Sequence, residues 1–119
     1  MFRQILDELL ATTAGSQAAM FLDWEGETVE LACDHDLSDH ELRIMSAYQG
    51  IFLSRLRDLC AKVEAGEPIR FKIELETKVV LSYDVKDGYF IVMLADRSFN
   101  EGLGWRRLEQ CRDRLLAEM

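Results

Sequence analysis

The sequence predicts an α+β domain in the order α-β-β-α-β-β-β-α, an antiparallel five-stranded sheet with helices on both faces. Three observations predict it: helical spacing of apolar residues in three segments, short apolar or alternating runs in five others, and glycines at the turns between strands. With 119 residues, the chain is long enough for one domain with a real core and too short for two. We therefore expect a single domain over residues 1–119.

The N-terminal part predicts a helix followed by a β-hairpin. Apolar residues in 2–10 recur at the spacing of an amphipathic helix, and Gly15 provides a stop. The run 18–22 is apolar without alternation, which indicates a strand covered on both faces. Gly26 provides the turn, and 28–33 alternates as a half-exposed second strand.

A long helix is predicted over residues 38–65. Ser38 and Glu41 have the spacing of a capping box, and Gly66 and Pro68 end the helix. The stripe that we expect to pack on the sheet consists of Leu42, Met45, Phe52, Leu56, Leu59 and Val63, interrupted only by Gln49. A second apolar stripe beside it consists of Ile44, Ala47, Tyr48 and Ile51. The helix therefore has more apolar surface than one packing contact requires.

The C-terminal half predicts three strands and a helix. Residues 69–76 alternate strictly between apolar and charged, and 79–83 continue as the fourth strand. Asp87-Gly88 is a strong hairpin signal, and 89–95 is a second uninterrupted apolar run, so we expect its strand to be central. The last helix is expected over 105–119, after glycines that loosen its start.

Composition and charge exclude several classes of function. The chain has 14 basic and 22 acidic residues, and its net charge of -8 disfavours nucleic acid. No apolar run is long enough for a membrane span, and the N-terminus does not resemble a signal peptide, so we expect a cytoplasmic protein. No glycine-rich phosphate loop is present, so we expect no bound nucleotide or other cofactor.

The candidate reactive side chains do not form a recognisable site. Cys33, His35 and His40 lie in an acidic loop with metal-ligand types, but their spacing matches no metal motif and a solvated loop accounts for them. Cys60 and Cys111 fall on helix faces that we expect to be buried, where thiols are usually inert. We therefore predict no catalytic residue, no metal and no enzymatic activity.

The order of the elements and several segments resemble the roadblock/LC7 family, and most closely its small bacterial members that accompany Ras-like GTPases. The resemblance is carried by Ile5-Leu6-Asp7-Glu8-Leu9, Ala18 to Gly26, Val79 to Leu94 and Leu103-Gly104. It implies a profilin-like fold and a homodimer, in which the third strands pair edge to edge and the long helices lie side by side. It also implies a small Ras-like GTPase as the partner.

The residues of the long helix and of the third strand are the candidates for this interface. The alternating third strand has an edge that must be paired or covered, and Gly50, which costs about 1 kcal/mol relative to alanine within a helix, gives a second helix room to approach. The predicted dimer or partner interface is Ile44, Ala47, Tyr48, Gly50, Ile51, Arg55, Arg70, Lys72 and Glu74.

Some side chains keep two interpretations at this stage. Trp24, at a hairpin tip, either anchors a partner or folds back over a helix end. Arg55 and Arg57 either contact the GTPase or are solvated or paired with Asp58 and Glu64.

The sequence thus favours a non-enzymatic homodimer that regulates or scaffolds a small Ras-like GTPase, with activation of GTP hydrolysis as one possible role. The alternative is a small-molecule sensory module of the PAS type, which would bind a ligand between sheet and helix. The polar side chains available for such a pocket are Gln49, Ser82 and Tyr83.

Overall fold

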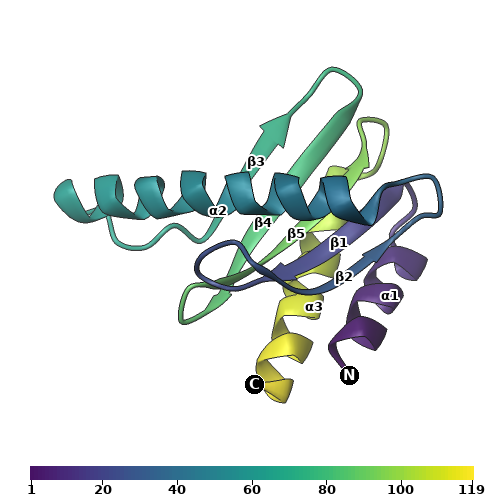
Figure 1. The fold of residues 1–119 in the computed structure, drawn as a ribbon, viewed down its shortest axis with the longest axis horizontal. Coiled ribbons are helices and arrows are strands. Elements are labelled where there is room, and N and C mark those ends of the chain that lie inside the picture. The colour runs from purple at the N-terminus through teal and green to yellow at the C-terminus, as the bar shows by residue number, and fades with distance from the viewer.

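The computed structural model describes residues 1–119 and has the predicted order of elements. Helix α1 and the first hairpin are followed by the long helix, three further strands and the C-terminal helix (Figure 1). The bounds are α1 Phe2–Thr12, β1 Ser16–Leu22, β2 Thr28–Cys33, α2 Asp39–Lys62, β3 Arg70–Glu74, β4 Lys78–Lys86, β5 Tyr89–Asp96 and α3 Glu101–Glu118.

The strands form one antiparallel sheet in the order β2-β1-β5-β4-β3. Strand β5 lies at the centre and β1 beside it, and both are buried over most of their length. This confirms that their uninterrupted apolar runs are covered on both faces. Strands β2 and β3 are the two edges of the sheet.

The helices cover the two faces of the sheet unequally. Helices α1 and α3 pack together on one face, and Figure 1 shows α2 crossing the other face alone. The core beneath α1 and α3 contains 16 buried residues, among them Leu6, Phe21 and Leu108. The core beneath α2 contains 10, among them Met20 and Phe90. Helix α2 is therefore the less completely covered layer.

Helix α3 begins earlier than the sequence suggested. Asn100 is its N-cap, since the Asn100 side chain accepts a hydrogen bond from the Leu103 backbone N–H at 3.0 Å. The predicted start at Trp105 was therefore wrong. Gly104 lies inside the helix, where an added Cβ would come within 2.4 Å of the Phe99 ring. This glycine makes room for a phenylalanine rather than loosening the helix.

The buried face of α2 also differs from the prediction. Its buried residues are Leu42, Ser46, Gln49, Gly50 and Leu53. Gln49 was expected to interrupt the stripe, but it is buried because its side chain pairs with the Ser82 hydroxyl, which donates to Gln49 Oε1 at 3.1 Å. Three apolar side chains that were expected on the sheet are exposed instead, namely Phe52, Leu59 and Val63.

Candidate interaction surface on α2 and β3

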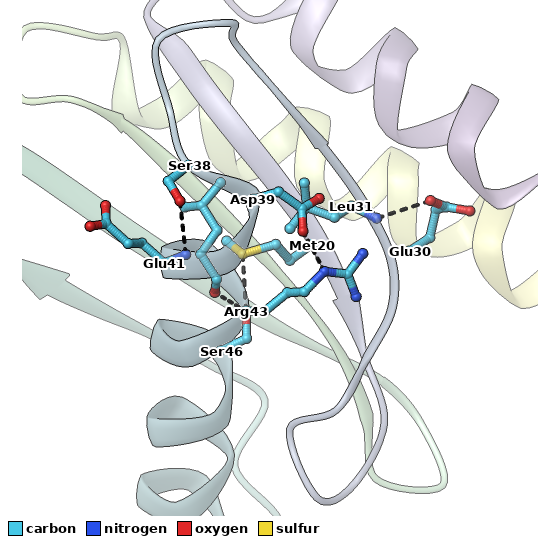
Figure 2. Close-up of polar contacts among 9 residues, drawn as sticks. Met20, Glu30, Leu31, Ser38, Asp39, Glu41, Arg43 and Ser46 are labelled. Carbon is cyan, nitrogen blue, oxygen red and sulfur yellow. Dashed lines mark hydrogen bonds and ion pairs between the residues drawn. The ribbon is translucent and has the colours of Figure 1, made fainter.

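The start of α2 is fixed by local polar contacts, which Figure 2 shows. The Ser38 hydroxyl accepts a hydrogen bond from the Glu41 backbone N–H at 3.2 Å, as the capping signal predicted. Asp39 forms an ion pair with Arg43 one turn later at 2.6 Å. The buried Ser46 hydroxyl contacts Met20 of β1 at 3.0 Å. The first two contacts stabilise the first turn of the helix, and the third joins α2 to the sheet.

Gly50 joins α2 to the turn between β1 and β2. A Cβ at this position would lie 2.6 Å from both the Glu25 carbonyl oxygen and the Gly26 Cα. Gly26 itself has a φ of 83° and lies equally close to the helix, so both glycines are needed for the contact. The prediction that Gly50 receives a second helix is therefore corrected, because its open side is filled by the same chain.

The other predicted residues of α2 lie together on its exposed side. We call Ile44, Ala47, Tyr48, Ile51 and Arg55 the outer stripe. All of them are exposed, and Tyr48 has 69% of its surface accessible. Arg55 forms no ion pair. The outer stripe is thus a mostly apolar strip ending in a free positive charge.

A second exposed apolar surface lies between α2 and the edge strand β3. We call Phe52, Leu59, Val63, Ile69 and Leu75 the β3-side stripe. Their exposed fractions include 59% for Leu59, 72% for Val63, 65% for Ile69 and 46% for Leu75. The Phe52 ring packs edge-on against Phe71 of β3, with 5.3 Å between the ring centroids. Phe52 therefore links α2 to β3, and Ile69 and Leu75 lie at the two ends of that strand.

The sequence contained a signal for this second surface. Helix α2 has 24 residues, which at 1.5 Å per residue makes about 36 Å. A five-stranded sheet measures only about 19 Å between its outer strands. A helix that crosses the strands must therefore extend beyond the sheet, and Figure 1 shows the C-terminal end of α2 doing so.

The three predicted residues of β3 lie on the opposite side of the strand from Phe71. The Lys72 ammonium donates hydrogen bonds to Glu101 at 2.9 Å and pairs with Glu74 at 3.0 Å. These hydrogen bonds, to Glu101 first, raise the pKa of Lys72, and the bond from Lys72 lowers the pKa of Glu74. The Arg70 guanidinium lies 4.6 Å from the centre of the Trp105 ring. This side of β3 is therefore charged, and each of its three side chains contacts another side chain.

Arg57 connects the C-terminal half of α2 to the hairpin between β4 and β5. Its guanidinium donates a hydrogen bond to the Gly88 carbonyl at 3.1 Å and lies 3.6 Å from Asp84 and 3.9 Å from Glu67. These partners replace the expected Asp58 and Glu64. Partial burial raises the pKa of Asp84, and the charge of Arg57 offsets part of the rise.

The structure also places the remaining candidate side chains. Trp24 is exposed over about half of its surface, and its ring contacts Tyr89 edge-on at 5.6 Å between centroids. No three His, Cys, Asp or Glu side chains lie close enough together to hold a metal ion. The cavity between Leu53, Phe71 and the sheet has a volume of about 10 Å³, which holds one water molecule and no metabolite.

One outward-facing backbone group of the β2 edge is already hydrogen-bonded. At the β2 edge, the outward-facing N–H of Leu31 is occupied, because it donates to the carboxylate of the neighbouring Glu30 at 3.2 Å (Figure 2). The outward direction of this N–H follows from the bond between Asp34 N–H and the Gln17 carbonyl, which sets the alternation along the strand.

None of the three helices has the length and apolar character that a membrane span requires.

The sequence matches no protein-family model and no curated protein. Its structure, however, is similar to several solved structures over nearly the whole chain. The roadblock/LC7 domain from Streptomyces avermitilis has a TM-score of 0.85 at 15% identity, with 95% of this chain and 92% of that chain covered. MglB of Myxococcus xanthus has a TM-score of 0.87 at 16% identity, with 98% and 92% covered.

A third similar structure is MglB in a tetrameric arrangement, with a TM-score of 0.87 at 12% identity and with 98% of this chain and 85% of that chain covered. With TM-scores of 0.85 to 0.87, all three share the fold described above. The chain has the roadblock/LC7 fold and is similar to MglB throughout its length.

Proposed function

We propose that this protein is a non-enzymatic homodimer that regulates or scaffolds a small Ras-like GTPase. The observation that carries the proposal is the extent of apolar surface left exposed on α2 and β3 in a domain whose two cores are otherwise well packed. Contiguous apolar surface of this kind marks protein interaction sites.

The β3-side stripe is the surface that we assign to self-association. It borders the free edge of β3, and it includes Leu59 and Val63 on the part of α2 that extends beyond the sheet. In a dimer with a two-fold axis, the same patch of both subunits forms the interface. The projecting end of α2 in one subunit would therefore pack against the projecting end of α2 in the other. The tetrameric arrangement of a similar MglB supports self-association in this fold.

The outer stripe is the surface that we assign to the GTPase. It lies on the side of α2 opposite the residues that are buried on the sheet, so we expect it to stay free when the β3-side stripes pair. The resemblance to bacterial roadblock proteins that accompany Ras-like GTPases supplies the class of partner. The regulation that we propose is activation of GTP hydrolysis, nucleotide exchange or scaffolding of the GTPase. We also propose that the protein is located in the cytoplasm.

Light scattering after size exclusion, combined with binding to candidate GTPases, tests both assignments. The candidates are small Ras-like GTPases encoded beside this gene, loaded with GDP or with a non-hydrolysable GTP analogue. We expect Leu59→Asp to weaken the dimer, because it buries an unpaired charge. We expect Ile51→Asp to leave the dimer intact and to weaken GTPase binding. Val29→Asp, at a comparably exposed apolar position on β2, is the matched control.

The two parts of the proposal fail in different ways. A wild-type protein that is monomeric at all concentrations would contradict the homodimer. Absence of a complex with every candidate GTPase in both nucleotide states would contradict the partner assignment. Loss of the dimer in Ile51→Asp but not in Leu59→Asp would show that the two stripes have the opposite roles.

A further inference from the structure

We propose that the groove between α1 and α3 binds the C-terminal residue of a partner protein, through its carboxylate and an apolar side chain. The groove lies on the face of the sheet opposite α2, where α1 and α3 pack together (Figure 1). Neither the outer stripe nor the β3-side stripe contributes a residue to it. The inference therefore goes beyond the proposed function and is independent of the homodimer and of the GTPase.

The floor of the groove is apolar. It consists of Ile5 and Leu9 of α1 and Cys111 of α3, each of which is 4% exposed. The groove has a volume of about 210 Å³. An apolar cavity of about 150 Å³ takes up benzene, whereas sites for metabolites and cofactors usually have about 300–1,000 Å³. The groove therefore has room for one side chain of a larger molecule.

The rim of the groove carries one uncompensated positive charge. Arg114 forms an ion pair with Glu8 across the groove, so these two charges cancel. Arg107 forms no ion pair. Its single hydrogen bond is donated by Nη1 to the side-chain oxygen of Gln110 at 3.1 Å. The charge of Arg107 is therefore available to an anionic group.

The remaining donors of Arg107 suit a carboxylate. With Nη1 bound to Gln110, the edge that carries Nε and Nη2 stays without a partner, and two parallel N–H groups of this kind bind both oxygens of a carboxylate. The Nε–H is shielded from solvent and has no acceptor, which is unusual in folded proteins. We expect the guanidinium to turn toward the groove when a carboxylate supplies that acceptor.

A C-terminal residue supplies both chemistries at the required spacing. Its carboxylate and its side chain branch from the same Cα, so the carboxylate can reach Arg107 while a leucine, isoleucine, valine or methionine side chain covers the floor. The side-chain carboxylates of aspartate and glutamate carry no apolar group of that size. The groove is open to solvent, so the preceding residues of the partner can leave it.

Binding of short peptides to the full chain tests this inference. The probe is a peptide that ends in leucine with a free carboxylate, titrated into isotope-labelled protein and followed by the backbone amide signals. We expect the signals of α1 and α3 to shift and those of α2 to stay unchanged. The same peptide with a C-terminal amide should bind about tenfold more weakly or worse, because it lacks the charge that pairs with Arg107. A peptide that ends in serine should lose affinity because it leaves the floor uncovered.

Variants of the rim separate recognition from folding. Arg107→Gln should raise the dissociation constant of the leucine peptide about tenfold or more. Arg106→Gln is the matched control, since Arg106 is an exposed arginine of α3 that forms no ion pair and does not line the groove. Gln110→Trp should abolish binding by filling the groove from an exposed position. An unchanged melting temperature shows that each variant is folded.

Several results would overturn the inference. Equal affinity for the free and amidated peptides would show that the groove does not recognise a carboxylate. Equal affinity for isocaproate, which has the carboxylate and side chain of leucine without a peptide, would assign the groove to a small free acid instead. Signals that do not shift with any probe, or that shift only in α2, would also contradict it. None of these results changes the tests of the homodimer or of the GTPase.

Discussion

At the scale of the residue, the missing side chain of Gly50 sets the distance between α2 and the turn that carries Gly26. A substitution here acts on the packing of the chain itself and not on a partner. The same position was interpreted from the sequence as room for a second helix, because an isolated glycine in a helix indicates a close approach without indicating what approaches.

Gly50→Ala should lower the free energy of unfolding by about 1–3 kcal/mol, because the new methyl group overlaps the Glu25 carbonyl and the Gly26 backbone. Gly102→Ala is the matched control, since an added Cβ in α3 meets only the Asn100 side chain at 3.6 Å. The control should be neutral or stabilising by up to about 1 kcal/mol. Urea unfolding measures both, and equal effects would contradict the close contact.

Cys111 should be chemically inert in the folded protein. Burial raises the pKa of its thiol to about 12, so it carries no thiolate at pH 8. We expect a thiol reagent at pH 8 to modify the half-buried Cys33 and Cys60 and to reach Cys111 only after unfolding. The pKa of this thiol is higher in the folded protein than its usual value of 9.0, so the protonated thiol contributes to the stability of the fold below pH 9.0. This contribution is lost as the pH rises from 9.0 toward 12. Rapid modification of all three thiols would contradict this burial.

At the scale of the element, α2 has two halves with different support. The first half is capped by Ser38 and packed on the sheet through Leu42, Ser46 and Gln49. The second half depends on Arg57, whose guanidinium reaches the hairpin at Gly88. Arg57 is therefore the main polar contact that holds this half of the helix, beside the apolar packing of Phe52 and Leu53.

Arg57→Ala should lower the free energy of unfolding by about 1–3 kcal/mol, because the Gly88 carbonyl and the partly buried Asp84 lose their common partner. Arg55→Ala, an arginine half a turn away with no ion pair, should change it by less than about 0.5 kcal/mol. Hydrogen exchange should accelerate in residues 54–62 for the first variant alone. Equal exchange in both variants would show that Arg57 does not hold the helix.

The sequence predicted the elements better than their faces. Periodicity and turn residues were enough for the order of all eight elements, because alternation and helical spacing report which side of each element is apolar. They could not show that Gln49 is buried, because its partner Ser82 is distant in the sequence. They also assigned Leu59 and Val63 to the sheet, because an apolar stripe looks the same whether its own chain or a second chain covers it.

At the scale of the whole molecule, stability should depend on protein concentration. If folding and dimer formation are coupled, a hundredfold rise in concentration stabilises the folded state by about 2.7 kcal/mol through mass action. Calorimetry over that range should show a rising melting temperature for the wild type and for Val29→Asp. Leu59→Asp should melt at a constant temperature, and a constant temperature for the wild type would argue against a dimer.

The occupied edge of β2 has a consequence for how large an assembly can become. A sheet with two free edges could add subunits without limit and grow into fibres. Here the carboxylate of Glu30 already binds the outward N–H of Leu31. This bond removes one of the outward donors that an added strand would need, so it disfavours strand addition at this edge. The side chain of Glu30 therefore works against open-ended aggregation through the β2 edge.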